Sequence, residues 1–234
     1  MPVDTKESMV RVEQEIAKCD RCPDLVLCRK NPVIGRGADR AKVMIIGYVP
    51  DIKSAEETGS PFRNSPEGEL LLQLLERAGC SVEENAYLTY IVKCVPKTCE
   101  HKDRSAEKTN RLRLLGENNI CLLTDRECTG RIATPTLLER ENCLHHLSRE
   151  ISVTTPHVLM PLGLEATTTI LEMYLSISPS HKTMSDYHMR VYSSPSFKIV
   201  PLYPPELIIQ NEDTYSLKEY EKDFHKIGKF LEMS

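Results

Sequence analysis

Short apolar runs alternate with amphipathic segments along this chain, and that alternation restricts the folds open to it. The run 42–47 (KVMIIG) is apolar after its lysine and ends at a glycine, which is typical of a strand buried on both faces. Segment 67–78 has leucines at helical spacing and is closed by Gly79, which indicates an amphipathic helix. Further strands are expected at 86–93, 157–163 and 197–200, and further helices at 7–17, 136–151, 165–174 and 216–232.

Strands that alternate with helices of this length favour an α/β fold, in which helices cover both faces of a parallel sheet. A chain of 234 residues is long enough to bury one proper core, so we expect a single domain over residues 1–234. Ligands in such folds bind at the carboxyl ends of the strands. The loops after Gly47, Lys93 and Val200 are therefore where a functional site is expected.

The composition is that of an ordinary chain with a slight acidic excess. The net charge is −4 with 30 Lys and Arg residues, so a DNA-binding protein of this composition must gather its basic residues on one face. No apolar run approaches the ~18 residues of a membrane span, and the N-terminal residues lack the apolar core of a signal peptide. We therefore expect an intracellular protein with no membrane partner.

Nine cysteines in such a chain indicate a reducing compartment, the cytoplasm or the nucleus, and favour metal binding or free thiols over disulfides. Cys19 and Cys22 form a CxxC pair, which also suits a zinc knuckle, a redox dithiol or a chance pairing. Cys94 follows the expected strand 86–93, and Cys143 lies in the expected helix 136–151. The cysteines alone leave several kinds of site open.

The sequence around these cysteines resembles the family 4 uracil-DNA glycosylases. Segments 44–51 (MIIGYVPD) and 56–62 (EETGSPF) resemble that family's first motif, in which G-E-A-P-G is followed by an acidic pair and G-x-P-F. Segment 87–96 (YLTYIVKCVP) resembles Y-x-T-N-V-V-K-C-x-P, and 156–166 (PHVLMPLGLEA) resembles P-x-V-I-V-A-L-G-x-x-A. Segment 200–205 (VPLYPP) occupies the place of the closing P-T-Y-H-P. The resemblance extends over nearly the whole chain.

The resemblance implies a fold, a cofactor and a partner. The fold is a three-layer α/β/α arrangement with a central four-stranded parallel sheet, and the partner is DNA. The implied cofactor is a structural 4Fe–4S cluster, for which Cys19, Cys22, Cys94 and Cys143 match the family's ligands in order. Zinc at the same thiols, or thiols without metal, are the alternatives. Cys28 is interpreted as a small core residue or as a substitute ligand.

Three polar positions of the family are replaced here. In the family, a carboxylate helps to position the attacking water, and Tyr48 stands in its place here. Tyr90 stands in place of an asparagine that reads the uracil edge. Pro204 stands in place of a histidine that stabilises the departing base. Phe62, which the resemblance places under an extruded base, is retained. These four residues form the expected base pocket. Because losing one donor to developing charge lowers a rate by roughly 10²–10³-fold, ordinary uracil excision is not expected.

Three other residues are candidates for replacement catalytic groups. Asp51 lies just beyond the lost carboxylate and could activate water, although a turn or capping role is the simpler interpretation. His181 and His188 lie in the loop before the last strand, where some relatives carry a reactive histidine. Surface imidazoles are the simpler interpretation of both.

A charged insertion, residues 98–134, lies between Cys94 and Cys143. It makes the distance in sequence between these two cysteines much longer than in the family that the chain resembles. A basic segment beside the cluster could contact DNA phosphates, and a solvated loop or an arm for a protein partner is the alternative. The candidate DNA-binding residues are Lys93, Lys97, Lys102 and Arg104. A second metal site could use Cys99, Cys121, Cys128 and His101, although their spacing is irregular.

Three functions follow from these observations. The favoured one is an iron–sulfur glycosylase-like protein that binds DNA, or a replication or repair partner, without excising uracil. The second is an enzyme that hydrolyses the N-glycosidic bond of a different or modified base with non-standard catalytic residues. The third is a protein-interaction module with no nucleic-acid role.

Overall fold

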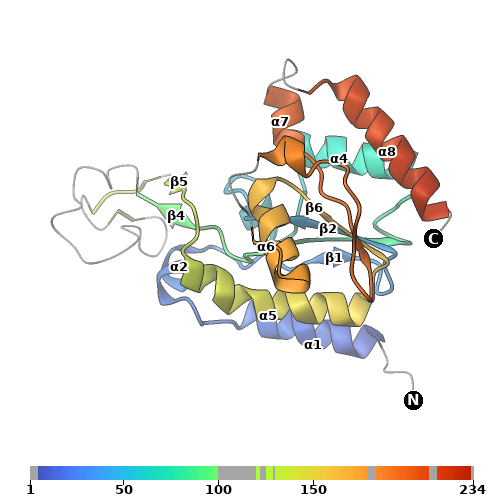
Figure 1. Ribbon diagram of the computed structural model, residues 1–234. Helices are drawn as coiled ribbons and strands as arrows, with labels where there is room; N and C mark the ends of the chain where they lie inside the picture. The colour runs from blue at the N-terminus through green and yellow to red at the C-terminus, as the bar shows by residue number, and fades with distance from the viewer. Residues whose placement is uncertain are drawn as a thin grey trace.

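A six-stranded sheet forms the centre of this protein in the computed structural model (Figure 1). The structure describes residues 5–99, 120–121, 125–128, 130–178, 183–210 and 215–232. The strand order is β1-β3-β2-β6-β8-β7. The strands are β1 (Arg36–Gly37), β3 (Ala86–Tyr90), β2 (Val43–Gly47), β6 (Val158–Pro161), β8 (Lys198–Ile199) and β7 (Tyr192–Ser193).

The four central strands, β3, β2, β6 and β8, are parallel, which confirms the predicted α/β class and its four-stranded parallel centre. The edge strands β1 and β7 are antiparallel to their neighbours, so the sheet has six strands rather than four. Each edge strand has two residues, which is too short to give a periodic pattern in the sequence.

Helices cover both faces of the sheet (Figure 1). One face carries α1 (Thr5–Ala17), α5 (Leu137–Thr154) and α6 (Leu164–Leu175). The other carries α4 (Pro66–Arg77), α7 (Pro205–Gln210) and α8 (Leu217–Glu232). The connections contain α2 (Pro23–Cys28), α3 (Ala55–Thr58) and a 3₁₀ turn at Met184–Asp186. The short helices α2, α3 and α7 were missed by the sequence analysis.

Alternation along the strands explains the three layers. All five residues of β2 are buried; Val43 and Ile45 face the layer of α4 and α8, whereas Met44 and Ile46 face that of α1 and α5. Burying one such side chain stabilises the fold by about 1.5–3 kcal/mol relative to leaving it exposed. The prediction of a strand buried on both faces is confirmed.

Local capping fixes where two of the predicted helices begin. Ser65 accepts a hydrogen bond from the Gly68 N–H at the start of α4. Thr136 and Glu139 form a capping box at the start of α5, in which each side chain bonds the other residue's backbone N–H. These caps set the direction of α4 and α5, which carry residues of the two cavities described below.

A separate two-stranded antiparallel ribbon lies outside the main sheet. It pairs β4 (Lys97–Thr98) with β5 (Arg131–Ile132), at the two ends of the insertion, and it projects from the body of the molecule (Figure 1). Among the described residues, no helix is both long enough and apolar enough to span a membrane.

Candidate functional site

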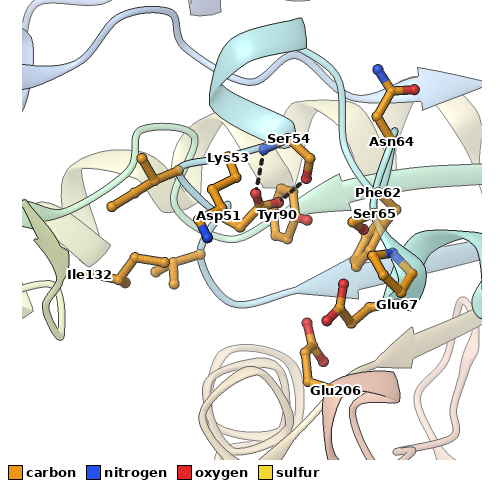
Figure 2. A pocket seen from close by; sticks show the side chains of 13 residues that line it. Asp51, Lys53, Ser54, Phe62, Asn64, Ser65, Glu67, Tyr90, Ile132 and Glu206 are labelled. Atoms are coloured by element: carbon orange, nitrogen blue, oxygen red, sulfur yellow. Dashed lines mark hydrogen bonds between the residues drawn. The ribbon is translucent and has the colours of Figure 1, made fainter. Parts of the chain in front are cut away.

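A cavity of about 470 Å³ opens at the carboxyl end of the parallel strands. The loop after β2, the segment leading into α4, the end of β3 and the start of α7 form its walls. Its most informative lining residues are Asp51, Lys53, Phe62, Glu67, Tyr90 and Glu206 (Figure 2). The ribbon contributes Ile132. The cavity therefore lies at the edge of the sheet where ligands of parallel α/β folds bind.

Tyr90 stacks on Phe62 inside this cavity. The ring centroids are 4.8 Å apart with an interplanar angle of 30°, and both side chains are buried. Gly47 gives the Tyr90 ring its room, because a Cβ at Gly47 would lie only 2.4 Å from the ring. Phe62 itself has a left-handed backbone, with φ of 52°, that non-glycine residues seldom adopt. The stack is thus fixed by its neighbours on both sides.

Asp51 lines the same cavity, but hydrogen bonds hold both of its carboxylate oxygens (Figure 2). Oδ1 accepts from the Ser54 N–H at 2.6 Å. Oδ2 accepts from the Ser54 hydroxyl at 2.6 Å and from the Ala55 N–H at 3.2 Å. Asp51 thus closes the turn that leads into α3, which is the simpler of the two interpretations.

Two carboxyl groups that the sequence analysis did not single out, those of Glu67 and Glu206, point toward one another across the cavity (Figure 2). Although Glu206 reaches solvent, desolvation by the cavity walls raises its pKa. The charges of Glu67 and Asp51 also raise this pKa, against a hydrogen bond from the backbone of Glu206 that lowers it. Glu206 lies directly after the closing segment 200–205, and that proximity was the only sequence signal for it.

The other two expected pocket residues lie elsewhere. Tyr48 is half-buried and packs with the residues on the opposite face of the sheet, in the layer of α1 and α5. Pro204 lies beside Gly163, 3.7 Å from where a Cβ would be, and is not part of the cavity wall. The structure therefore brings together Phe62 and Tyr90 but not Tyr48 or Pro204.

His188 is held by hydrogen bonds rather than directed into the cavity. Its Nδ1 accepts from the Tyr203 N–H at 3.1 Å, so Nε2 carries the proton and donates to the Asp223 carboxylate at 3.0 Å. Burial opposes the charge of Asp223, but hydrogen bonds from His188, Tyr215 and Lys226 lower its pKa overall. His188 thus attaches α8 to the segment before β7. His181 lies outside the described residues.

Lys93 and Lys97, two of the four candidate DNA-binding residues, are each 1% exposed. The Lys93 ammonium pairs with the buried Glu150 and also donates to the Tyr90 carbonyl at 2.7 Å. The Lys97 ammonium pairs with the buried Glu56 at 3.0 Å. Neither ammonium reaches the surface, so neither can contact a phosphate in this arrangement. Lys102 and Arg104 lie outside the described residues.

A second, enclosed cavity is lined by the four cysteines that match the family's cluster ligands, Cys19, Cys22, Cys94 and Cys143. Three N–H groups point at their sulfurs. The Lys93 backbone donates to Cys143 at 3.2 Å, Arg29 to Cys94 at 3.3 Å, and Asn142 to Cys22 at 3.6 Å. Burial raises the pKa of Cys143 to about 12 and that of Cys94 to about 11. The Lys93 N–H and charge act in the opposite direction on Cys143, and the Arg29 guanidinium does so on Cys94.

His146 lines the same enclosed cavity and is 2% exposed. Neither of its ring nitrogens has a hydrogen-bond partner in the part of the chain that the structure describes. Burial, followed by the nearby charges of His145 and Lys93, lowers its pKa to about 3. Within the same part of the chain, no three His, Cys, Asp or Glu side chains are positioned to hold a metal ion as they stand.

Comparison with known proteins places residues 34–228 within the model of the uracil DNA glycosylase superfamily. A type-4 uracil-DNA glycosylase of Archaeoglobus fulgidus is 26% identical over 226 residues, which cover 95% of this chain and 92% of that protein. One of Thermotoga maritima is 26% identical over 231 residues, covering 97% and 96%. A type-5 uracil-DNA glycosylase of Thermus thermophilus is 28% identical over 110 residues, covering 36% and 50%.

Proposed function

The chain belongs to the uracil-DNA glycosylase superfamily, and on that premise we propose that it binds DNA without excising uracil. The observation that carries the proposal is the stack of Tyr90 on Phe62 at 4.8 Å. In the family that the motifs resemble, the phenylalanine stacks under the extruded base, and here the protein's own tyrosine covers that ring. A base can take this place only if Tyr90 leaves a buried position.

Among the residues that the structure describes, the polar groups that the family carries at positions 48, 90 and 204 are also absent from the cavity wall. Tyr48 packs on the other face of the sheet, and Pro204 offers no hydrogen-bond donor from either its side chain or its backbone. Asp51 is engaged by hydrogen bonds in the turn before α3. Each missing stabilising group lowers such a rate by roughly 10²–10³-fold, so the joint loss supports a protein without ordinary uracil excision.

Contact with DNA needs basic residues at the surface, and two lie beside the cavity. Lys53 lines the cavity and is exposed, and Arg63 is exposed next to Phe62. We propose that these two residues make the phosphate contacts that the sequence analysis assigned to Lys93 and Lys97. A protein partner in replication or repair is the alternative occupant of this face.

We further propose that Cys19, Cys22, Cys94 and Cys143 bind a 4Fe–4S cluster. The four thiols converge on one enclosed cavity, and three of them already receive N–H groups that would stabilise thiolates. The unpartnered nitrogens of buried His146, on the same wall, suit a polar group at this place. When bound, the cluster would join the N-terminal segment to β3 and α5 and so contribute folding free energy.

Base release and DNA binding, measured on one anaerobic preparation, test this function. The substrates are single- and double-stranded oligonucleotides that carry uracil, hypoxanthine, xanthine or 5-hydroxymethyluracil. We expect salt-dependent binding without release of any base. Release of uracil by the unmodified protein would overturn the proposal.

A second candidate function rests on Glu206. A carboxyl group with a raised pKa in a cavity of about 470 Å³ could protonate a departing purine, which is the general-acid step that glycosylases need. This would make the protein a glycosylase for a different base. Release of hypoxanthine or xanthine that falls at least tenfold in Glu206→Gln but not in Glu69→Gln, an exposed glutamate of α4, would favour it.

A further inference from the structure

Four cysteines that do not belong to the proposed cluster gather at the base of the ribbon. They are Cys28 at the end of α2, Cys99 directly after β4, and Cys121 and Cys128 within the insertion. Cys28, Cys99 and Cys121 are no more than 3% exposed, and the partly buried Cys128 packs against them. The Cys99 sulfur lies 2.9 Å from that of Cys121 and 3.8 Å from that of Cys128.

Backbone hydrogen bonds in the insertion account for this convergence. The Cys121 N–H donates to the Arg126 carbonyl at 2.8 Å, and the Asp125 N–H donates to the Cys121 carbonyl at 2.9 Å. An antiparallel bridge joins Ile120 to Glu127 next to them. These contacts bring Cys121 and Cys128 together, while the pairing of β4 with β5 brings Cys99 beside both.

Among the described residues of this region, the cysteines are the core. The third hydrophobic cluster of the protein contains these four side chains, whereas Ile120 and Ile132 are 37% and 45% exposed. A unit of this size cannot bury enough apolar surface to fold, and natural proteins stabilise such units with disulfides or a metal ion. Buried thiols that converge from three separate segments are therefore the feature that needs an explanation.

We propose that Cys28, Cys99, Cys121 and Cys128 bind one zinc ion as four thiolates. Zinc–sulfur bonds of about 2.3 Å in a tetrahedron separate the sulfurs by roughly 3.8 Å. The Cys99–Cys128 separation of 3.8 Å already fits, and the Cys99 and Cys121 sulfurs, at 2.9 Å, must move apart by roughly 1 Å on binding. His101, considered as a fourth ligand from the sequence, lies outside the described residues, and Cys28 takes that position.

The site would connect the insertion to the main cavity. Lys97 of β4 pairs with Glu56 of α3, the helix that follows the turn closed by Asp51, and Ile132 of β5 lines the cavity. Zinc at the base of the ribbon would therefore hold one wall of the 470 Å³ cavity in place. This inference rests on the cysteine geometry alone, so it stands whether or not the protein excises a base.

Metal content and zinc X-ray absorption on the full-length, anaerobically purified protein test the proposal. We expect about one zinc per chain with a first shell of four sulfurs at about 2.3 Å. Cys121→Ser and Cys128→Ser should lose at least tenfold in bound zinc while they keep their iron. Cys80→Ala, which changes a buried cysteine of another cluster, should keep both metals.

Several results would overturn the proposal. One is protein from zinc-supplied cells that contains no zinc, and another is a zinc shell made of nitrogen and oxygen. Equal loss of zinc from Cys80→Ala, or a Cys99–Cys121 disulfide found by mass spectrometry after thiol alkylation, would also contradict it. If the serine variants do not fold, the absorption spectrum of the unmodified protein still decides, because it counts the sulfur ligands directly.

Discussion

Two cavities flank the end of β3 on opposite faces of the sheet, and they differ in what each has kept. The enclosed cavity lined by Cys19, Cys22, Cys94 and Cys143, here called the thiol cavity, has all four cysteines that match the family's cluster ligands. N–H groups point at three of these sulfurs. The 470 Å³ cavity, called the base cavity after the proposed function, has Phe62, but Tyr90 covers this ring. The other two positions at which the family carries polar groups are Tyr48 and Pro204, which lie outside its wall. Under the proposed function, the region that would hold a structural cluster is thus preserved, while the region that would carry the family's chemistry is altered. The five predictions below test this contrast.

The largest effect is expected in the thiol cavity. Cys143→Ser should abolish iron binding and lower the free energy of unfolding by more than about 4 kcal/mol, since loss of a structural metal is among the few single changes of that size. Iron analysis, visible absorption and denaturant titration measure both effects. Cys80→Ala serves as the control for a buried cysteine, and a Cys143→Ser protein with full iron and stability would break the contrast.

The buried ion pair under the thiol cavity comes next. Lys93→Met leaves the Glu150 carboxylate buried without its cation, which should cost about 3–5 kcal/mol of stability. Lys93→Met/Glu150→Gln removes both charges and should recover most of this loss. Urea unfolding of the three proteins gives the comparison. A loss below about 1 kcal/mol in the single variant would mean that the pair is not buried in solution.

Opening the aromatic stack tests the base cavity itself. Tyr90→Asn should lower stability by about 3 kcal/mol, because it removes a large buried ring. The same variant should bind uracil-containing DNA at least tenfold more tightly than the unmodified protein does, since the face of Phe62 becomes accessible. Tyr90→Phe keeps the stack and should change neither quantity by much. Unchanged uracil affinity in Tyr90→Asn would show that the tyrosine does not block the pocket.

The hydrogen bonds of Asp51 predict a smaller, purely structural effect. Asp51→Ala removes the hydrogen bonds that close the turn before α3 and should cost about 1 kcal/mol. DNA affinity and any base release should be unaffected, as measured with the oligonucleotides described above. A variant with normal stability and altered base release would instead assign Asp51 to the reaction.

Glu206 gives the smallest effect and the one with a pH signature. Its pKa is raised in the folded protein, so the folded state favours the protonated carboxyl group. The stability that this group contributes is fully present below about pH 4.3, the pKa of an unfolded glutamate, and is lost as pH rises through the folded pKa. Glu206→Gln should therefore be more stable than the unmodified protein at pH 7 but equal to it near pH 4. Because the side chain reaches solvent, the gain should stay below about 1 kcal/mol. Thermal unfolding against pH measures it, and a gain that persists at pH 4 would contradict this assignment.

Much of the fold could be predicted because its signals are local. The apolar run at 42–47 predicted a strand buried on both faces, and the leucines of 67–78 predicted α4 almost to the residue. The two-residue strands β1 and β7 carry no period, so the edges of the sheet could not be predicted. The candidate site was predicted less completely. Phe62 and Tyr90 meet in the cavity, whereas Glu67 and Glu206 had no motif to mark them.

The sequence by itself determined the α/β class, the family and the order in which its motifs occur. Only the tertiary structure decided that Tyr90 covers Phe62, that Lys93 and Lys97 are buried in ion pairs, and that Cys28 joins the cysteines of the insertion. The reason is physical. Periodicity fixes which face of an element is buried, but which side chains meet depends on packing between segments far apart in the chain, and no local pattern records that packing.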